Sequence, residues 1–553
     1  MLDVIGRSQR ARVCEYNSDV SFRTPYVISS NSEDPVSIHA DAGGRSLIIG
    51  KNAVRVEGRI LVPSSYDSDG ITMCQHKVCV IRSIENITID DNAEIVMIPN
   101  CFEFRNDSRK LIAMITRIRE AAGYGRLLYA SGIAEPSMLA LLVYMGVDIV
   151  DDVLCKAYGM QGIRCIPEGH IRTGKNETEY NIQELSKECE KISDFIGSGR
   201  LRELVDQRAP SSPFSVAVLR LMDDLAFGYL EETCPTVGEK FACNSTQSLF
   251  RPEVKRFREK MLKDYRKPSH KRILILLPCS ARKPYHTSKS HKAFSSAIHT
   301  ADHDVFVHEV IVTSPLGTVP RELDVFYPAN SYDIPVTGEW KCQEKAFIRE
   351  MVRNITDQGY DKVISHLGRT TELISDICEM TETCVGDPTS PVSLANLDNE
   401  IRKAAASLKD RSYMVDRMET MRSILSFQFS PEAADIIMDG SHVTGKFPYW
   451  KIINGKTQIG MLTPERQMVS FTAEGSEILA KNNINVVEML DFELKGNVFA
   501  VGVSNADDSI RIGDEAVVIL NGKVKAIGVA QMSGKEMKDL KRGIAVKVRH
   551  KSK

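Results

Sequence analysis

The sequence predicts a multidomain protein of the α/β and α+β fold classes. The chain has 553 residues, too many for one hydrophobic core, and a typical size of about 150 residues per domain suggests roughly three or four domains. Apolar runs alternate with helical patterns between residues 108 and 150 and again between residues 273 and 380, which is the rhythm of βαβ units. Residues 474–553 instead favour β-strands, with a strong hairpin signal at Asn521-Gly522.

The composition narrows the class of protein further. Hydrophobic residues make up 42% and charged residues 26% of the chain, and the formal net charge is -2, as in an ordinary globular protein. The 13 cysteines are scattered and form no C-x-x-C pair, which favours reduced intracellular thiols over a disulfide framework or a compact zinc knuckle. The apolar stretch Leu139–Val150 is too short to span a membrane, and the N-terminus lacks the apolar core of a signal peptide. We therefore expect a cytoplasmic protein that does not bind membranes.

The first domain is predicted to span residues 1–235. Up to residue 100, short β-like runs alternate with turn clusters such as Asn31–Pro35 and Ser64–Gly70. Two helices and two strands then follow with short loops, at Ser108–Ala122, Leu127–Ala130, Pro136–Met145 and Val147–Val150. This alternation suits a parallel α/β barrel or a doubly wound sheet.

One segment of this domain resembles a known family. Residues 129–152, YASGIAEPSMLALLVYMGVDIVDD, are similar to the tRNA-guanine transglycosylases, whose barrels carry a Gly-rich turn, a helix begun by Pro and a Gly-Val-Asp-x-Phe-Asp strand end. The resemblance places Asp151 where that family keeps its nucleophilic carboxylate. Val150, however, replaces the aromatic residue, and the zinc motif of the family, C-x-C-x-x-C followed by a distant His, is missing.

The resemblance and its gaps together imply a degenerate TIM-barrel-like domain. We expect it to lack transglycosylase activity and a bound metal, and to serve as a binding scaffold. In the alternative interpretation, Asp151 and Asp152 are two carboxylates at a solvated strand end.

An open α/β sandwich, the predicted catalytic core, is expected over residues 236–410. Its strands are Ile273–Leu277, Asp304–Val312 and Lys362–Ile364, and its helices are Lys292–Ile298, Lys341–Ile355 and Arg369–Met380. If the strands are parallel, Cys279, Ser314 and His366 emerge at one edge of the sheet, where ligands of open α/β sheets bind.

A long irregular segment follows the second of these strands. It spans residues 314–340 and holds Glu322, Tyr332, Asp333 and Trp340. Loops of this length inside a compact domain are usually functional or disordered, and the aromatic residues here argue against disorder.

Reactive side chains are concentrated in the loop that follows the first strand. Within residues 279–291 stand Cys279, Ser280, Lys283, Tyr285, Ser288, Ser290 and His291. Neighbouring cations would favour a thiolate at Cys279, and His291 could act as a general base or acid. Two alternatives stay open, namely inert packing of a lone cysteine and a phosphate cradle built from Ser, Lys and Arg at a helix start.

Two smaller domains complete the predicted chain. Residues 411–473 suggest a small α+β module, and residues 474–553 a β-rich domain. Between Lys535 and Lys553 there are eight Lys and Arg residues against two acids, the balance expected where a phosphate backbone binds. A solvated, charged chain end is the alternative.

The C-terminal pattern resembles a PUA domain, a small RNA-binding β-barrel. The match covers Gly513-Asp514-Glu515, Lys541-Arg542-Gly543 and the closing Val546-x-Val548-Arg549-His550. On this resemblance we expect RNA contacts from Lys541, Arg542, Lys547 and Arg549.

A second resemblance covers the reactive loop. The pattern Pro278-Cys279-x-x-x-Lys283-Pro284-Tyr285-x-x-Ser288-x-x-His291 is similar to the core motif of the archaeosine synthase α subunits, and the segment from SPLG to VTGEW matches the same domain. The resemblance implies addition of an amine to the nitrile of 7-cyano-7-deazaguanine (preQ0) at position 15 in the D-loop of tRNA. It implies free lysine as co-substrate, with glutamine-derived ammonia as the older proposal, no cofactor or zinc, and a radical-SAM partner subunit. It leaves homodimerisation open.

Two mechanisms suit these residues. In the first, Cys279 attacks the nitrile to give a thioimidate, with His291 or Asp333 supplying the proton, and the amine then displaces sulfur. In the second, the amine attacks directly after deprotonation by Asp333 or His291, while Lys283 contacts phosphate. The catalytic set is thus Cys279, Lys283, His291 and Asp333. The expected substrate-binding set is Ser280, Tyr285, Ser288, Ser290, Ser314, Glu322, Tyr332, Trp340 and His366, where Tyr285, Tyr332 or Trp340 would stack on an exposed base.

Two other function classes also stay open. An active base-exchange transglycosylase would incorporate free base into tRNA, although the missing zinc ligands argue against it. A non-catalytic tRNA-binding adaptor would leave the nucleoside mass unchanged.

Overall fold

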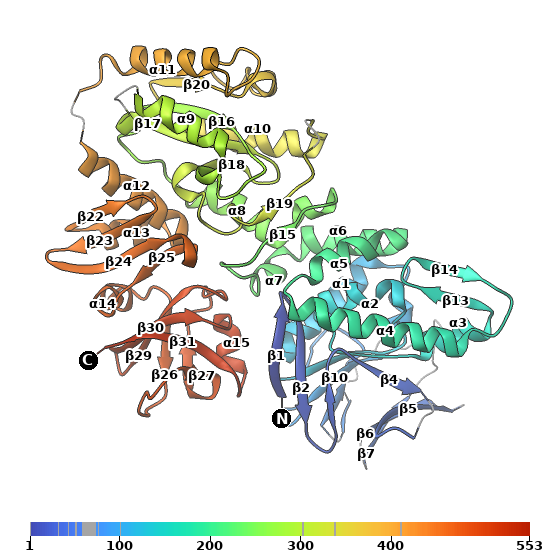
Figure 1. The fold of residues 1–553 in the computed structure, drawn as a ribbon. Coiled ribbons are helices and arrows are strands. Elements are labelled where there is room, and N and C mark those ends of the chain that lie inside the picture. The colour runs from blue at the N-terminus through green and yellow to red at the C-terminus, as the bar shows by residue number, and fades with distance from the viewer. Residues whose placement is uncertain are drawn as a thin grey trace. The chain divides into compact units, whose positions relative to one another are not determined.

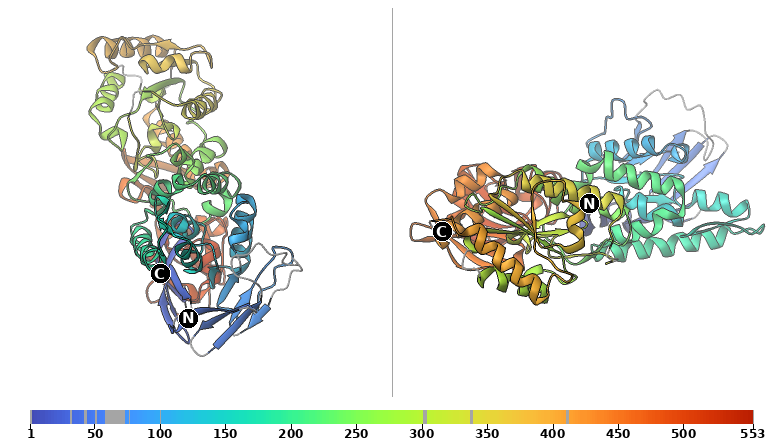
Figure 2. Two further views of the ribbon diagram at one scale, coloured as in Figure 1. Left: turned by 90° about the vertical axis from the view of Figure 1, so that its right-hand side faces the viewer. Right: turned by 90° about the horizontal axis from the view of Figure 1, so that it is seen from above.

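The computed structural model describes residues 2–30, 33–41, 44–49, 52–57, 73–75, 77–99, 101–300, 304–336, 339–409 and 412–552. Three predicted features fall partly or wholly outside these ranges, namely the turn clusters Asn31–Pro35 and Ser64–Gly70 and the domain boundary at residues 410 and 411. The chain forms two compact units (Figure 1, Figure 2). The first comprises residues 1–234, 495–511 and 531–546, and the second residues 235–494, 512–530 and 547–553. The division into four domains stays a prediction.

The first unit is built on a curled, mixed sheet. Its strand order is β7-β6-β5-β4-β12-β11-β10-β9-β8. The bounds are β4 Tyr26–Ser30, β5 Val36–Asp41, β6 Gly44–Ile49, β7 Asn52–Glu57, β8 Met73–Gln75, β9 Val78–Val80, β10 Ile95–Ile98, β11 Leu127–Ala130 and β12 Ile149–Asp151. The central strands from β4 to β9 run parallel, in line with the predicted βαβ rhythm. A separate sheet contains β1 Leu2–Ser8, β2 Ala11–Asn17 and β3 Ser21–Arg23.

Helices of this unit lie above its strands in the view of Figure 1. They are α1 Ser108–Ala122, α2 Pro136–Tyr144, α3 Val153–Met160, α4 Thr178–Gly197, α5 Leu201–Arg208, α6 Pro213–Leu225 and α7 Phe227–Glu231. The Asp107 side chain caps α1 by accepting a hydrogen bond from the Lys110 amide. Pro136 begins α2, and every residue of α2 is buried, which explains why this helix is apolar all round. A hairpin of β13 Ile163–Ile166 and β14 Gly169–Arg172 follows α3.

A buried ion network links Arg12 of β2 and Arg119 of α1 through Asp148. Both oxygens of Asp148 are bound by arginines, Oδ1 by Arg12 Nε at 2.9 Å and Oδ2 by Arg119 Nη1 at 2.7 Å. Since all three side chains are buried, removing one partner would leave a charge uncompensated. Among the described cysteines of this unit, Cys79 is disulfide-bonded, so the expectation of fully reduced thiols is wrong at that position.

A five-stranded sheet of order β18-β17-β16-β20-β21 organises the second unit. The strands are β16 Ile273–Pro278, β17 Val307–Thr313, β18 Gly317–Pro320, β20 Lys362–Ser365 and β21 Thr381–Glu382. The neighbours β16, β17 and β20 are parallel, as predicted. The main helices around it are α8 Pro252–Lys263, α9 Lys289–Thr300, α10 Cys342–Thr356 and α11 Pro391–Ala405.

Strand β16 is buried on both faces, as its unbroken apolar sequence predicts. Ile273, Ile275 and Leu277 share a core cluster with residues of α9 and α11. Leu274 and Leu276 face the other way and share a second cluster with residues of α8 and α10.

The predicted helix Arg369–Met380 is wrong. A 3-10 helix, Gly368–Leu373, and turns take its place, and the next α-helix begins only at Pro391. The Thr371 hydroxyl bonds the Ser365 hydroxyl at 2.7 Å, and Arg349 binds both the Leu373 carbonyl and the Asp376 carboxylate. These tertiary contacts override the helical pattern of the segment.

The rest of the second unit contains the small α+β module. It consists of α12 Tyr413–Gln428, α13 Pro431–Met438, the meander β22 Ser441–Lys446, β23 Tyr449–Asn454, β24 Thr457–Thr463 and β25 Met468–Phe471, and α14 Ala473–Lys481. The module combines helices with an antiparallel sheet, in line with the predicted α+β class.

The C-terminal residues are β-rich, as predicted. The elements of this segment are β26 Val486–Met489, β27 Val498–Phe499, β28 Val503–Ala506, β29 Glu515–Leu520, β30 Lys523–Ala530, α15 Gly534–Asp539 and β31 Ile544–Lys551. Strands β29 and β30 form the predicted antiparallel hairpin. Its turn residues Asn521 and Gly522 have φ angles of 50° and 73°, as a type I′ turn requires. Within the described residues, no helix has the length and apolarity needed to cross a membrane.

Candidate active site

The reactive loop begins where β16 ends, at the carboxyl edge of the sheet. Pro278 lies opposite Val312 of β17, and Leu276 lies opposite Ser365 of β20. Cys279 follows directly and is exposed. The predicted emergence of Cys279, Ser314 and His366 from the ends of parallel strands is therefore confirmed. The Ser280 hydroxyl donates to the Arg282 carbonyl at 2.9 Å, which tightens the turn after Cys279.

A short strand pair brings Asp333 to this region. Strand β15, Phe241–Ala242, runs parallel to β19, Tyr332–Asp333. The pairing places Lys240 beside Asp333, with Nζ 2.6 Å from Oδ2 and both side chains largely exposed. This hydrogen bond lowers the pKa of the Asp333 carboxyl, so Asp333 is an ionised carboxylate at the surface. Lys240 was not among the predicted site residues.

Three hydroxyl groups meet beneath the loop. The Tyr285 and Tyr332 hydroxyls bond each other, and the Thr313 hydroxyl lies 2.5 Å from that of Tyr332 and 3.3 Å from that of Tyr285. Both tyrosines are buried, and burial raises the pKa of each phenol. Both phenols therefore stay protonated, and their buried rings form a floor for the loop above them.

Lys283 lies on this aromatic floor. Its Nζ is 3.8 Å from the centroid of the Tyr332 ring and 5.7 Å from that of Tyr285, within cation–π range. Burial lowers the pKa of the Lys283 ammonium and the charge of Lys240 lowers it further, while Cys279 and Asp333 act in the opposite direction. The structure thus brings three of the four predicted catalytic residues, Cys279, Lys283 and Asp333, into one electrostatically linked group.

His291 occupies a different environment. Its ring is 1% exposed, and its Nδ1 accepts a hydrogen bond of 2.8 Å from Arg321 Nη2. Burial and the neighbouring Arg321 charge lower the His291 pKa to about 3, so the imidazole is neutral near pH 7. The ring packs against Tyr285 and Phe294, with 5.4 Å between ring centroids in each pair.

Most of the predicted substrate-binding residues use their polar atoms in hydrogen bonds within the protein. Ser288 Oγ caps α9 by accepting from the His291 amide at 3.2 Å, and it contacts the Ser290 hydroxyl at 3.3 Å. Ser314 Oγ donates to Glu344 Oε1 at 2.6 Å. Both ring nitrogens of the buried His366 are engaged, Nδ1 with the Thr383 hydroxyl and Nε2 with the Pro388 carbonyl, each at 2.8 Å.

Glu322 and His291 lie at a separate cavity of about 450 Å³. Glu322 is buried, accepts from the Tyr265 hydroxyl at 2.5 Å and lies 3.4 Å from His308 Nε2. The residues lining this cavity do not include Cys279, Lys283 or Asp333. The sequence-predicted residues therefore do not form a single site. Trp340 is half-buried and packs against the larger core of the unit.

The transglycosylase-like segment ends in a buried carboxylate. Asp151 is 0% exposed and accepts hydrogen bonds from the Tyr129 and Ser131 hydroxyls, each at 2.7 Å, and from the Gly132 amide at 3.1 Å. Asp152 is buried as well. The interpretation of a solvated strand end is therefore wrong, because β12 lies between β4 and β11 in the interior of the sheet.

The four predicted RNA-binding residues differ in availability. Lys541, Arg542 and Lys547 are exposed. Arg549 instead binds the buried carboxylate of Glu515 and donates to the Phe471 carbonyl at 3.2 Å. Its guanidinium therefore has a structural partner inside the protein.

Comparisons with known proteins cover most of the chain. Residues 254–401 match a domain of unknown function (DUF5591), and residues 488–551 match the PUA domain. The chain is 31% identical over 494 residues to archaeosine synthase subunit alpha of Methanosarcina acetivorans, covering 81% of this chain and 78% of that protein. It is 30% identical over 500 residues to archaeosine synthase of Haloferax volcanii, covering 84% and 83%. It is 24% identical over 470 residues to tRNA-guanine(15) transglycosylase of Methanobrevibacter smithii, covering 76% and 65%. The predicted C-terminal PUA domain is thereby confirmed.

Proposed function

The chain belongs to the archaeosine synthase family, and we propose that it adds the amine of free lysine to the nitrile carbon of preQ0 at position 15 of tRNA. Members of this family act in archaeosine biosynthesis, so the chain is a tRNA-modifying enzyme that carries an RNA-binding PUA domain. The observation that carries the finer proposal is the grouping of Cys279, Lys283 and Asp333 at the carboxyl edge of β16.

The chemistry needs a nucleophile and a proton donor. Addition of an amine R′–NH₂ to a nitrile R–C≡N gives the amidine R–C(=NH)–NH–R′ without loss of atoms. A nitrile carbon is a modest electrophile, so the reaction gains from a thiolate nucleophile and from protonation of the nitrile nitrogen. Cys279 is exposed at the end of a strand, and Lys283 supplies an ammonium with a lowered pKa, which makes it a better acid than an ordinary lysine.

The two groups support a covalent route. The Cys279 thiolate forms a C–S bond with the nitrile carbon, and the nitrile nitrogen takes a proton from Lys283, which gives a thioimidate. The lysine amine then attacks the same carbon, the C–S bond breaks with its electron pair returning to sulfur, and the proton lost by the amine returns to Lys283. Atoms and charge balance over the two steps.

The roles of the other predicted catalytic residues change on this proposal. The ion pair with Lys240 lowers the pKa of Asp333, which makes Asp333 a weak base. Asp333 is better suited to orient the ammonium group of the incoming lysine. His291 is buried, and Arg321 occupies its Nδ1, so we assign it to positioning Tyr285 rather than to proton transfer.

Binding of the tRNA is proposed to use exposed cations and a half-buried ring. Tyr285 and Tyr332 are too deeply buried to stack on a base, and Lys283 lies over the Tyr332 ring. Of the three predicted stacking residues, half-buried Trp340 remains the candidate. Lys541, Arg542 and Lys547 are free to meet phosphates.

A partner subunit belongs to the same proposal. Relatives of this chain are named subunit alpha, and we propose a radical-SAM partner that cleaves the lysine adduct.

The test of the function is to incubate the purified chain with preQ0-containing tRNA and ¹⁵N-labelled lysine and to measure the nucleoside mass. A mass increase equal to one lysine supports the proposal. An unchanged mass in the presence of bound tRNA favours a non-catalytic adaptor.

A further inference from the structure

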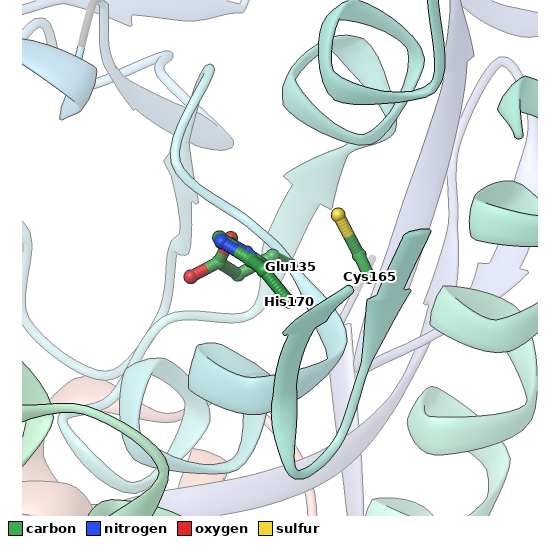
Figure 3. Close-up of side chains that lie close together, drawn as sticks. All are labelled: Glu135, Cys165 and His170. Carbon is green, nitrogen blue, oxygen red and sulfur yellow. The ribbon is translucent and has the colours of Figure 1, made fainter. Parts of the chain in front are cut away.

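Three potential metal ligands meet in the first unit, far in sequence from the reactive loop. They are Glu135, which precedes α2, Cys165 on β13 and His170 on β14. One donor atom of each lies within 4.8 Å of the other two. Figure 3 shows the His170 ring against the Glu135 carboxylate, with the Cys165 side chain beside them. His170 Nε2 is 2.7 Å from Glu135 Oε2.

The local structure fixes these side chains. Cys165 and His170 lie opposite each other in the β13–β14 ladder. The side chain of Asn181, fully buried in α4, accepts from the Cys165 amide at 2.7 Å and donates to the Cys155 carbonyl at 3.1 Å. One buried amide therefore sets the backbone positions of two cysteines.

A second thiol lies next to the cluster. Cys155 of α3 is 0% exposed, and its thiol is within hydrogen-bonding reach of Cys165. The Cys155 thiol donates to the Ala134 carbonyl at 3.6 Å and lies outside the three-residue cluster. The spacing contains no C-x-x-C pair and is unrelated to the C-x-C-x-x-C motif that is missing here.

Residues outside the cluster also orient the Glu135 carboxylate. Glu135 Oε1 accepts from Arg105 Nη2 at 3.1 Å and from Ser137 Oγ at 3.2 Å. These bonds hold one oxygen and leave Oε2 directed at His170. Such outer partners are usual around metal ligands, where they fix the orientation of the ligating group.

We propose that Glu135, Cys165 and His170 bind a divalent cation of the zinc class. Thiolate and imidazole suit zinc and disfavour magnesium and calcium, which prefer oxygen ligands. Glu135 is 5% and Cys165 0% exposed, so a substrate would have little access to the thiol. Two buried ligands and one at the surface fit a structural ion that joins the start of α2 to the β13–β14 hairpin. Binding requires Cys165 as thiolate and His170 unprotonated at Nε2, so protons are released.

The test uses the full chain after dialysis against a chelator, with Co²⁺ and Zn²⁺ as probes. We expect one equivalent of Co²⁺ to give the intense visible bands of a tetrahedral site and a thiolate-to-cobalt charge-transfer band, both abolished by Zn²⁺. We expect Zn²⁺ to raise the unfolding temperature of the chain. Cys165→Ser should lose the charge-transfer band, and His170→Ala, whose side chain is partly exposed, should weaken Co²⁺ binding at least tenfold while remaining folded.

Cys378→Ser provides the matched control, since Cys378 is a half-buried cysteine of the other unit. It should bind Co²⁺ as the unchanged chain does. The proposal is overturned if the folded chain gives no Co²⁺ spectrum, or if the spectrum survives both Cys165→Ser and His170→Ala.

Discussion

The Lys283 ammonium lies 3.8 Å from the centroid of the Tyr332 ring. This contact orders the reactive loop, because Tyr332 is itself held by the hydroxyls of Tyr285 and Thr313. It also sets the chemistry of Lys283, since the aromatic floor removes water from the ammonium and lowers its pKa.

The pH dependence of adduct formation should report Lys283. As the proton donor, Lys283 must be protonated, so the rate should fall as pH rises through its pKa, which lies below the ordinary value of 10.5. Lys240 contributes to this lowering, so Lys240→Met should raise the pKa of Lys283 and move the basic limb to higher pH. Lys289→Met, which changes an exposed lysine of α9, is the control. A basic limb that stays in place in Lys240→Met would exclude Lys283 as the titrating group.

The hydroxyl contacts beneath the loop should contribute measurably to stability. Tyr332→Phe keeps the ring under Lys283 and removes two hydrogen bonds, so we expect a loss of about 1 kcal/mol in the free energy of unfolding. Tyr332→Ala also empties the ring volume and should cost about 3–5 kcal/mol. Urea unfolding followed by tryptophan fluorescence is suitable, since the chain has two tryptophans, Trp340 and Trp450, both in the second unit. Equal stability of the two variants would contradict this account of the floor.

We expect the basic residues of the PUA domain to have two different roles, one in stability and one in tRNA binding. Arg549→Ala leaves the carboxylate of Glu515, which is 0% exposed, without its partner and should destabilise the second unit by about 3–5 kcal/mol. Lys541→Ala and Arg542→Ala should leave stability unchanged and weaken tRNA binding, each reducing the salt dependence by about one phosphate contact. Tryptophan fluorescence and filter binding at several salt concentrations measure the two effects. Unchanged stability in Arg549→Ala would refute the structural role.

Asp151 should matter for folding and not for amine addition. The Tyr129 and Ser131 hydroxyls and the Gly132 amide now donate hydrogen bonds to Asp151, and in Asp151→Asn these donors would face a side-chain amide group. The substitution should therefore lower the free energy of unfolding of the first unit by about 1–3 kcal/mol. Thermal unfolding by circular dichroism measures this loss. Adduct formation per folded molecule should be unchanged. Loss of adduct formation in a fully folded variant would show that this carboxylate has kept a catalytic role.

Local patterns were sufficient to predict much of the fold. The apolar run of β16, the helix after the reactive loop and the Asn521-Gly522 hairpin each depend on residues close in sequence. The end of the apolar run at Pro278 also predicted the position of Cys279 at the carboxyl edge of the sheet.

Which residues come together at the site depends on contacts between segments distant in sequence, and no local pattern predicts these contacts. Lys240 reaches Asp333 through a two-residue strand pair between segments about ninety residues apart. Glu322 and His366 have reactive side chains, yet the fold buries both and binds their polar atoms. The Glu135, Cys165 and His170 cluster likewise arises from a helix start and a hairpin. Its only signal in the sequence is the proximity of Cys155, Cys165 and His170 within sixteen residues.

Replacement of Cys279 tests the central claim most directly. Cys279→Ser and Cys342→Ser each remove one exposed thiol of the second unit, and each is assayed by nucleoside mass with labelled lysine and preQ0-containing tRNA. If Cys279 attacks the nitrile, Cys279→Ser should lose adduct formation by at least about a hundredfold, and Cys342→Ser should match the unchanged chain. Adduct formation at a near-normal rate in Cys279→Ser would contradict the covalent route and leave direct attack by the amine.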